Sequence, residues 1–305
     1  MANSPLFVKY QSGGQFNVID QSLTTGQVFY VDSSSARAVN NVGAGQNPDY
    51  PFATIDFAIG QCAVDNGDVI YVMPNHASVM TTAGAISCDV SGIKIIGLGK
   101  GAARPTITSL TDPLGSLIAT CSVWLENLIF ASGVDATVNM VNIDSPDCVI
   151  KNCTFKDVTG QGTDMVVTTT NADRLLIEDC QFWQAVAAGP NSAIALVGSN
   201  DVIIRGCWFD GNYAVGAIDC RGEASLRLTV YSCKFWTANA ADIAIVDTIT
   251  GSTGIIGPYL SIMLTDNAAN ITEAITGAGF RCFDPIYVCN LAGEKGMLIN
   301  WIASA

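Results

Sequence analysis

A short motif recurs along the middle of the chain and constrains its fold more than any other feature. An apolar residue, two variable residues, a cysteine, one variable residue and a phenylalanine occur four times, with the cysteines at intervals of 27, 27 and 26 residues. The residues between the motifs vary while the interval holds, which is typical of stacked coils in a solenoid. The motif cysteines are Cys153, Cys180, Cys207 and Cys233, and the motif phenylalanines are Phe155, Phe182, Phe209 and Phe235.

Short strand-like runs separated by turn residues fill each interval. The run at Met165–Thr170, for example, precedes a turn at Asn171–Asp173 and a second run at Arg174–Ile177. A degenerate earlier copy of the motif, Leu125–Phe130, carries Leu128 at the cysteine position. Short strands with this period predict an all-β chain folded as a single-stranded parallel β-helix, rather than a sandwich, a propeller or a leucine-rich repeat.

The motif also predicts what fills the core of the coils. Equivalent residues on successive coils of a parallel β-helix lie about 4.8 Å apart, and alternate residues of a strand point to the same side. Each motif cysteine and phenylalanine should therefore face the core, as a ladder of thiols beside a stack of aromatic rings. A metal site is the alternative for the cysteines, but the chain has no Cys-x-x-Cys pair.

Composition bears on the state of the thiols and on the partners. The segment Met1–Leu6 has no basic or apolar leader, which predicts a product whose cysteines stay reduced in a cytoplasm. The chain has 11 cysteines, an odd number that cannot all form disulfides within one chain. Charged residues make up 13% of the chain, and the net charge is −13. This charge predicts no nucleic-acid partner. No apolar run approaches the ~18 residues that span a membrane, so we expect no membrane partner.

The two ends of a solenoid must be closed, because open edge strands promote aggregation. Residues 52–63 have the pattern of a helix, which we expect to cap the N-terminal end of the core. We divide the chain into an extended N-terminal arm at residues 1–27, a β-helix at residues 28–265 and a C-terminal cap and oligomerisation segment of β structure at residues 266–305. A frayed terminus is the alternative for the arm.

The N-terminal third contains four segments to compare with known families, namely Phe29–Asp32, Pro51–Asp56, Gly67–His76 and Ile95–Gly99. They look like the opening of pectate-lyase-like β-helix proteins and, more narrowly, of β-helix virion proteins of tailed bacteriophages, although Asn75 stands where glycine is commoner. The resemblance covers roughly residues 28–240 and implies right-handed coils and a homotrimer. Coils of this kind serve lyases, tailspikes and inert structural proteins alike.

We predict no catalytic, metal or cofactor site. The resemblance implies acidic calcium clusters with an arginine for lyases, or paired aspartates with a Gly-His-Gly motif for hydrolases. The chain has one histidine, His76, which we expect to close a turn. Glycoside hydrolysis needs two nearby carboxylates, and the positions three and four residues after the motif cysteines stack no two acids on neighbouring coils. Carboxylates of different subunits could still pair. We expect Glu178 and Arg205 to form a surface ion pair.

One outward column is the candidate working surface. The position three residues after the motif cysteine carries Lys156, Trp183, Asp210 and Trp236, and Trp208 lies nearby in the sequence. Tryptophans on an outward ladder can stack sugar rings or pack against another subunit. Because aromatic residues are enriched in interface cores, we predict intersubunit contact or cover by a loop, with glycan contact as the alternative.

Together these features favour a non-enzymatic structural virion protein of a tailed phage, assembled in the host cytoplasm. We expect a homotrimer that decorates or cements the capsid, with the major capsid protein or other virion proteins as partners. The first alternative is a tailspike or fibre that binds or degrades host polysaccharide. The second is a stand-alone bacterial polysaccharide lyase.

Overall fold

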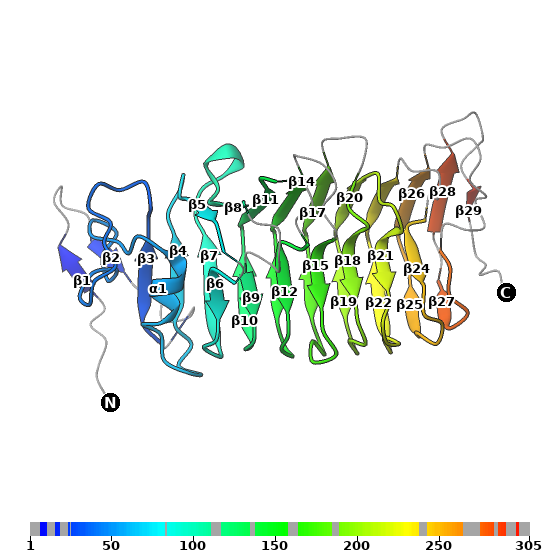
Figure 1. Ribbon diagram of the computed structural model, residues 1–305, viewed down its shortest axis with the longest axis horizontal. Coiled ribbons are helices and arrows are strands. Elements are labelled where there is room, and N and C mark those ends of the chain that lie inside the picture. The colour runs from blue at the N-terminus through cyan, green and yellow to red at the C-terminus, as the bar shows by residue number, and fades with distance from the viewer. Residues whose placement is uncertain are drawn as a thin grey trace.

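Three parallel sheets run along the length of the molecule and wind into a β-helix (Figure 1). Seven consecutive coils, from Val69 to Asp247, each contribute one strand to each sheet in turn. The all-β parallel β-helix predicted from the repeat is therefore confirmed. The computed structural model describes residues 7–10, 16–18, 24, 26–82, 84–110, 117–134, 138–157, 164–184, 189–237, 243–264, 275–283, 286–290 and 297–298.

We number the sheets in the order in which a coil visits them. Sheet 1 contains β3 (Val28–Val31), β4 (Val69–Val72), β7 (Ile93–Gly97), β10 (Val123–Glu126), β13 (Val149–Lys151), β16 (Leu176–Glu178), β19 (Ile203–Arg205), β22 (Leu228–Tyr231), β25 (Gly254–Ile256) and β27 (Phe280–Cys282). Sheet 2 contains β5 (Ala77–Met80), β8 (Thr106–Ser109), β11 (Ile129–Ser132), β14 (Thr154–Asp157), β17 (Gln181–Gln184), β20 (Trp208–Gly211), β23 (Lys234–Thr237), β26 (Leu260–Leu264), β28 (Ile286–Asn290) and β29 (Met297–Leu298). Sheet 3 contains β6 (Ile86–Cys88), β9 (Leu117–Ala119), β12 (Val141–Ile143), β15 (Asp164–Thr168), β18 (Ser192–Leu196), β21 (Gly216–Cys220) and β24 (Ile245–Asp247).

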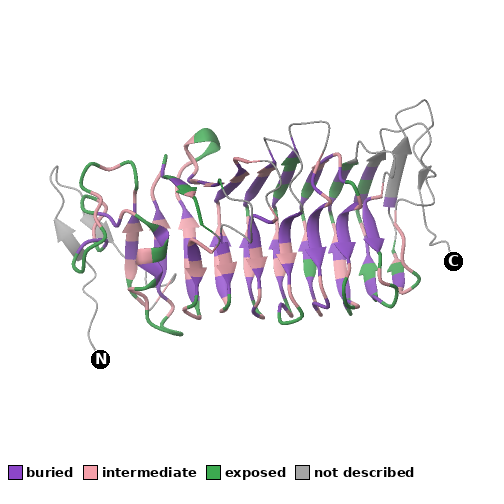
Figure 2. Cartoon of the chain, in the orientation of Figure 1, coloured by how far each residue is buried: buried purple, intermediate pink, exposed green. Residues whose placement is uncertain are grey.

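The motif phenylalanines form one continuous stack inside the coil. In-register pairing of the sheet 2 strands sets each ring directly on the next, and every one of these side chains is buried. Ring centroids from Phe155 to Phe235 lie 4.9, 4.9 and 4.7 Å apart, with interplanar angles of 5° or less. Phe130 of the degenerate copy extends the stack at 5.2 Å. Figure 2 shows bands of buried residues on the strands along the coil.

The motif cysteines lie at the turn from sheet 1 to sheet 2, where they are buried and carry no disulfide. Each thiol donates a hydrogen bond, at 3.2–3.3 Å, to the carbonyl oxygen two residues before it. Burial raises the pKa of Cys180 well above its ordinary value, so its thiol stays protonated and able to donate. Cysteine therefore suits a site that is small and apolar and still has a carbonyl group to satisfy.

The residue before each motif cysteine has a left-handed backbone. Its φ lies between 50° and 66°, which only residues such as asparagine, aspartate and glycine adopt readily. A single left-handed residue turns the chain from sheet 1 into sheet 2, so one short turn type repeats on four coils. These residues are Asn152, Asp179, Gly206 and Ser232.

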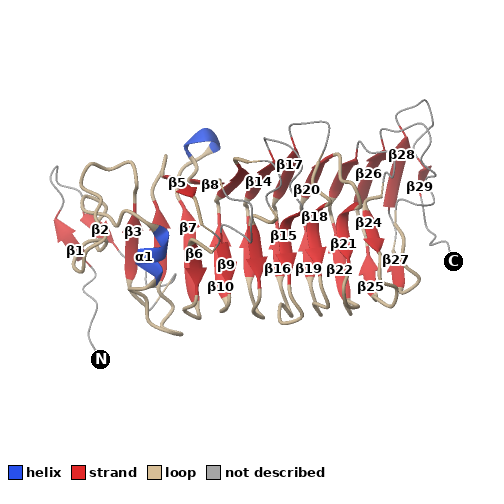
Figure 3. Ribbon diagram, in the orientation of Figure 1, coloured by secondary structure: helices blue, strands red, loops and turns tan. Residues whose placement is uncertain are grey.

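The N-terminal end of the core is covered by α1 (Ile55–Ile59), within the segment predicted to be helical. Its Ile55, Ala58 and Ile59 side chains are buried, and the hydroxyl of Thr54 accepts from the Phe57 amide as the N-cap. The helix is shorter than predicted because hydrogen bonds after Ile59 tighten to i−3 spacing as the chain turns toward β4. In the described residues, the other helical element is the 3₁₀ turn η1 (Gly101–Ala103), as Figure 3 shows.

Parts of both predicted terminal segments are described. In the arm, β1 (Phe7–Tyr10) and β2 (Phe16–Val18) form an antiparallel ribbon, and residues 1–6, 11–15, 19–23 and 25 lie outside the described residues. At the C-terminal end, β27 and β28 continue the parallel sheets beyond residue 265. There β29 pairs antiparallel with β28, which changes the strand direction. The domain boundaries themselves stay predictions.

Candidate functional site

The outer face of sheet 2 carries the predicted column. Lys156 pairs with Trp183, Trp183 with Asp210 and Asp210 with Trp236, on four consecutive strands from β14 to β23. Trp208 starts β20 two residues before Asp210, so it belongs to the neighbouring column. Strand alternation explains the arrangement, because the phenylalanine of each motif faces the core and the residues on either side of it face outward.

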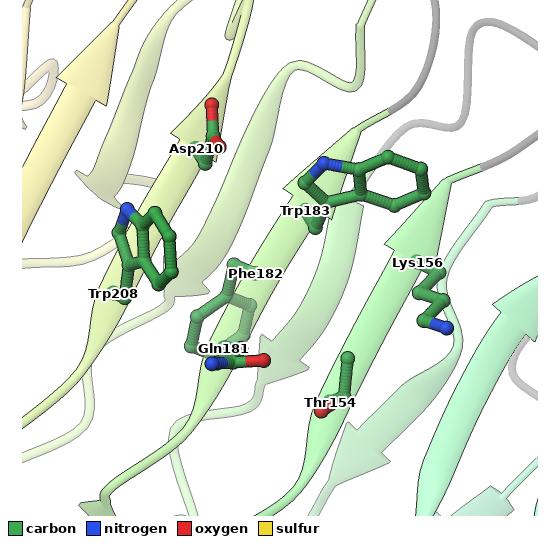
Figure 4. Close-up of a pocket in the computed structure, with 7 residues that line it drawn as sticks. All are labelled: Thr154, Lys156, Gln181, Phe182, Trp183, Trp208 and Asp210. Carbon is green, nitrogen blue, oxygen red and sulfur yellow. The ribbon is translucent and has the colours of Figure 1, made fainter. Parts of the chain in front are cut away.

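The three tryptophans form an exposed aromatic surface. Trp183 is 40% exposed, and Trp208 and Trp236 are each 43% exposed. Trp183 and Trp208 come from neighbouring strands and border a shallow hollow of about 340 Å³ (Figure 4). Trp236 lies beyond its lining. The lining residues are Thr154, Lys156, Gln181, Phe182, Trp183, Trp208 and Asp210.

The polar groups of the hollow are few and of mixed charge. Asp210 supplies the carboxylate among the described lining residues, and partial burial raises its pKa. Lys156 lies on the other side of Trp183, and Gln181 offers both a hydrogen-bond donor and an acceptor. Flat aromatic faces with scattered polar groups can bind a sugar ring or pack against another protein chain. One carboxylate does not supply the acid and base pair of glycoside hydrolysis.

The ion pair predicted between Glu178 and Arg205 forms on sheet 1. The guanidinium of Arg205 contacts Glu178 at 2.8 Å, and the ammonium of Lys151 contacts the other carboxylate oxygen at 3.0 Å. The hydrogen bond from Lys151 and the charge of Arg205 lower the pKa of Glu178. The predicted pair is confirmed, with Lys151 as an additional partner. Its exposed cations make it worth about 0–1 kcal/mol.

A second set of ion pairs, between aspartates and arginines, was not predicted from the sequence. Arg174 bonds both carboxylate oxygens of Asp147 at 2.7 Å, and Arg227 bonds both oxygens of Asp201 at 2.5 and 2.6 Å. These four residues recur at 27, 27 and 26 residues, which is the interval of the cysteines. The same period, applied to charged residues, would have found them.

Buried acids on sheet 3 also went unpredicted. Asp164, Asp219 and Asp247 are at most 8% exposed. The guanidinium of Arg221 bonds both oxygens of Asp164, at 2.5 and 3.2 Å, and reaches Asp219 at 3.8 Å. Burial raises the pKa of Asp164 to about 6, and Arg221 opposes that rise. Burial also raises the pKa of Asp219. The sequence signal that could have predicted these buried acids is the presence of polar residues within apolar strand runs.

Two hydroxyl groups complete this network. Thr248 donates to Asp219 at 3.0 Å, and the hydroxyl of Ser252 donates to Asp247 at 2.8 Å. Each of the three buried carboxylates therefore has a donor within hydrogen-bond distance. Buried polar groups of this kind stabilise a core when every member is satisfied. We interpret the network as structural.

His76 lies at the N-terminal end of the coil, away from the hollow. It is buried, its Nδ1 accepts the Ser33 amide at 2.9 Å, and its Nε2 therefore carries the proton and donates to the Ser78 hydroxyl. Burial lowers the pKa of His76 to about 4. These bonds tie the loop after β3 to β5, in agreement with the predicted turn-closing role.

No three histidine, cysteine or acidic residues gather as a metal-binding group within the described residues. No helix in that part of the chain is long and apolar enough to cross a membrane.

Comparisons with known proteins find solved structures that are similar to this chain at low sequence identity. The chain matches no protein-family model and no curated protein sequence. It is similar to a rhamnogalacturonan lyase at 13% identity and a TM-score of 0.48, over 80% of this chain and 75% of the other. It is similar to the Geobacillus virus E2 ORF18 protein at 13% identity and a TM-score of 0.32, over 94% and 68% of the two chains. An alginate lyase from Paenibacillus sp. str. FPU-7 has 9% identity and a TM-score of 0.27, over 75% of this chain and 92% of the other. At this level of likeness, the activities named for those proteins do not carry over to this chain.

Proposed function

We propose that this chain is a non-enzymatic structural protein of a tailed-phage virion, a homotrimeric β-helix that decorates or cements the capsid. The observation that carries the proposal is the aromatic surface formed by Trp183, Trp208 and Trp236. Each tryptophan is at least 40% exposed on one flat face of a chain with only 13% charged residues. Exposed aromatic clusters mark interaction surfaces, and tryptophan is among the residues enriched at interface hot spots.

The described acids support a structural role. The buried carboxylates of sheet 3 are held by Arg221, Thr248 and Ser252, and the exposed ones at the coil turns by Arg174 and Arg227. The contacts of Arg221, Thr248, Arg174 and Arg227 join residues of different coils, and Ser252 holds Asp247 within one coil, so these acids have structural partners. The resemblance of the N-terminal segments to phage β-helix proteins supports the virion location and the trimer.

Two measurements test this function. Quantitative mass spectrometry of purified particles should find the chain in copy numbers comparable with those of the capsid protein, and microscopy of the virion should place it on the capsid shell. A few copies located on the tail would contradict the proposal. So would release of reducing or unsaturated sugar ends from host polysaccharide by the purified protein.

The hollow beside Trp183 favours one second candidate, a tailspike or fibre that binds host glycan. Its two indole faces can stack on the apolar faces of sugar rings, and Gln181 and Asp210 can bond sugar hydroxyl groups. The two candidates make opposite predictions for the same variant.

The double variant Trp183→Ala/Trp236→Ala should dissociate the trimer. Hot-spot tryptophans contribute about 2 kcal/mol or more each, so the loss of both should raise the dissociation constant by about 1,000-fold. Light scattering at several protein concentrations measures the change. Tyr259→Ala, which removes an aromatic residue that is 65% exposed at the turn before β26 and outside the tryptophan columns, is the matched control. Intact trimers that have lost only glycan binding would favour the tailspike candidate.

A further inference from the structure

The N-terminal end of the solenoid exposes one edge of each sheet, and two of these edges are closed. On sheet 1, the outward backbone groups of Tyr30 bond Gly45 and Phe52 at 2.7 and 2.8 Å. On sheet 3, the amide of Ser87 bonds the carboxylate of Asp56 in α1 at 3.0 Å. Closing an edge in this way prevents pairing with another chain.

Sheet 2 ends in β5, and its edge is closed only at the start. Ser33 bonds both the amide and the carbonyl of Ala77, each at 3.0 Å. The carbonyls of His76 and Met80 bond β8, so by the alternation of a parallel ladder the amide and carbonyl of Val79 point away from it. Within the described part of the chain, no hydrogen bond reaches the backbone of Val79 from that side. Its side chain is 54% exposed.

The N-terminal ribbon of β1 and β2 is a small sheet that could pair with the open edge of β5. It consists of two short strands, and within the described residues it pairs with no third strand. A two-stranded ribbon is only marginally stable alone, so it gains from an added strand. Strand β1 has four residues, as does β5. An open sheet edge accepts such a strand by main-chain hydrogen bonding.

We infer that the ribbon of a second copy adds to β5 at Val79 and completes sheet 2. The predicted arm joins the solenoid at its N-terminal end, where the amide of Gln27 donates to the buried carboxylate of Asp68 at 2.6 Å. Among the described strands of its own chain, the ribbon pairs only with itself. In the trimer of the proposed function, on which this inference rests, parallel copies bring the ribbon of one copy level with β5 of the next.

Val79→Pro tests the edge without disturbing the coil. Proline removes an amide that faces away from β8, which an edge strand tolerates, so the fold should persist. Proline keeps the carbonyl, so each contact loses one main-chain hydrogen bond of about 1 kcal/mol, and the dissociation constant of the oligomer should rise about fivefold or more. Val79→Thr keeps the amide and should leave the constant unchanged. Sedimentation of the full-length proteins over a range of concentrations measures it, and circular dichroism checks folding.

Mixing two singly substituted full-length proteins identifies the segment that pairs with β5. Copies carrying Val79→Cys should form a disulfide with copies carrying Val8→Cys, and the product should have the mass of two chains on a non-reducing gel. Equal cross-linking by Val79→Cys copies alone would overturn the assignment to the ribbon. Equal dissociation constants for Val79→Pro and Val79→Thr trimers would overturn the inference while leaving the proposed trimer standing. A wild-type chain that stays monomeric would overturn both.

Discussion

Phe182→Ala is expected to lower the free energy of unfolding by about 3–5 kcal/mol, the cost of truncating a buried phenylalanine. Phe182 is fully buried, and its ring stacks between Phe155 and Phe209 at 4.9 Å on both sides. Truncation leaves a cavity and removes both contacts, and the neighbouring coils cannot close the gap because their spacing is held by the strand ladders. Urea unfolding followed by circular dichroism measures the loss.

The matched control for this stack is Gln181→Ala. Gln181 precedes Phe182 on β17 but faces outward and is exposed, so its truncation should change stability by no more than about 0.5 kcal/mol. The comparison separates the effect of the inner face from that of the strand. A loss below about 1 kcal/mol for Phe182→Ala would mean that the stack does not hold the coils together.

Arg221→Met is expected to cost about 3–5 kcal/mol at pH 8, because it leaves buried carboxylates without their cation. The Asp164 side chain is only 1% exposed, and Arg221 bonds both of its oxygens. The effect should exceed that of losing an exposed pair such as Arg174 with Asp147, which is worth about 0–1 kcal/mol. Thermal and urea unfolding at fixed pH measure it.

The loss caused by Arg221→Met should depend on pH in one direction. The folded pKa of Asp164, about 6, lies above its ordinary value of 3.8, so the folded state holds the extra proton between those values and stability falls as pH rises. Without Arg221 the folded pKa rises further, so the fall continues above pH 6. The variant should therefore differ from the wild type most at pH 8 and least near pH 4.

A double variant tests the cause. Arg221→Met/Asp164→Asn removes the unpaired charge, and at pH 8 it should be more stable than Arg221→Met alone. Equal losses for the single variant at pH 4 and pH 8 would show that Arg221 acts through packing and not through its charge.

The periodic part of the molecule was predictable from the sequence because each coil repeats the same local requirements. The interval of Cys153, Cys180 and Cys207 set the strand register, and strand alternation assigned Phe182 to the core and Trp183 to the surface. The structure has these pairings in register. The helix near residue 55 was predicted from its apolar spacing, although its end at Ile59 depends on how the chain turns toward β4.

The polar contacts between coils were harder to predict. The Asp147–Arg174 pair was within reach of the same arithmetic, because both residues hold equivalent positions on adjacent coils. Arg221 and Asp164 are 57 residues apart and do not share a position in the repeat. Which side chains meet across two coils depends on the variable segments between the strands, and these have no period.

The sequence by itself therefore determined the coil, its core columns and the outward column of Trp183 and Trp236, because a repeat with side chains alternating along each strand leaves one register for them. Only the tertiary structure decided that Trp183 and Trp208 border a hollow, that Arg221 satisfies buried acids, and that the β5 edge is open at Val79. Those features depend on residues distant in the chain meeting in space. Local propensity and period do not encode such meetings.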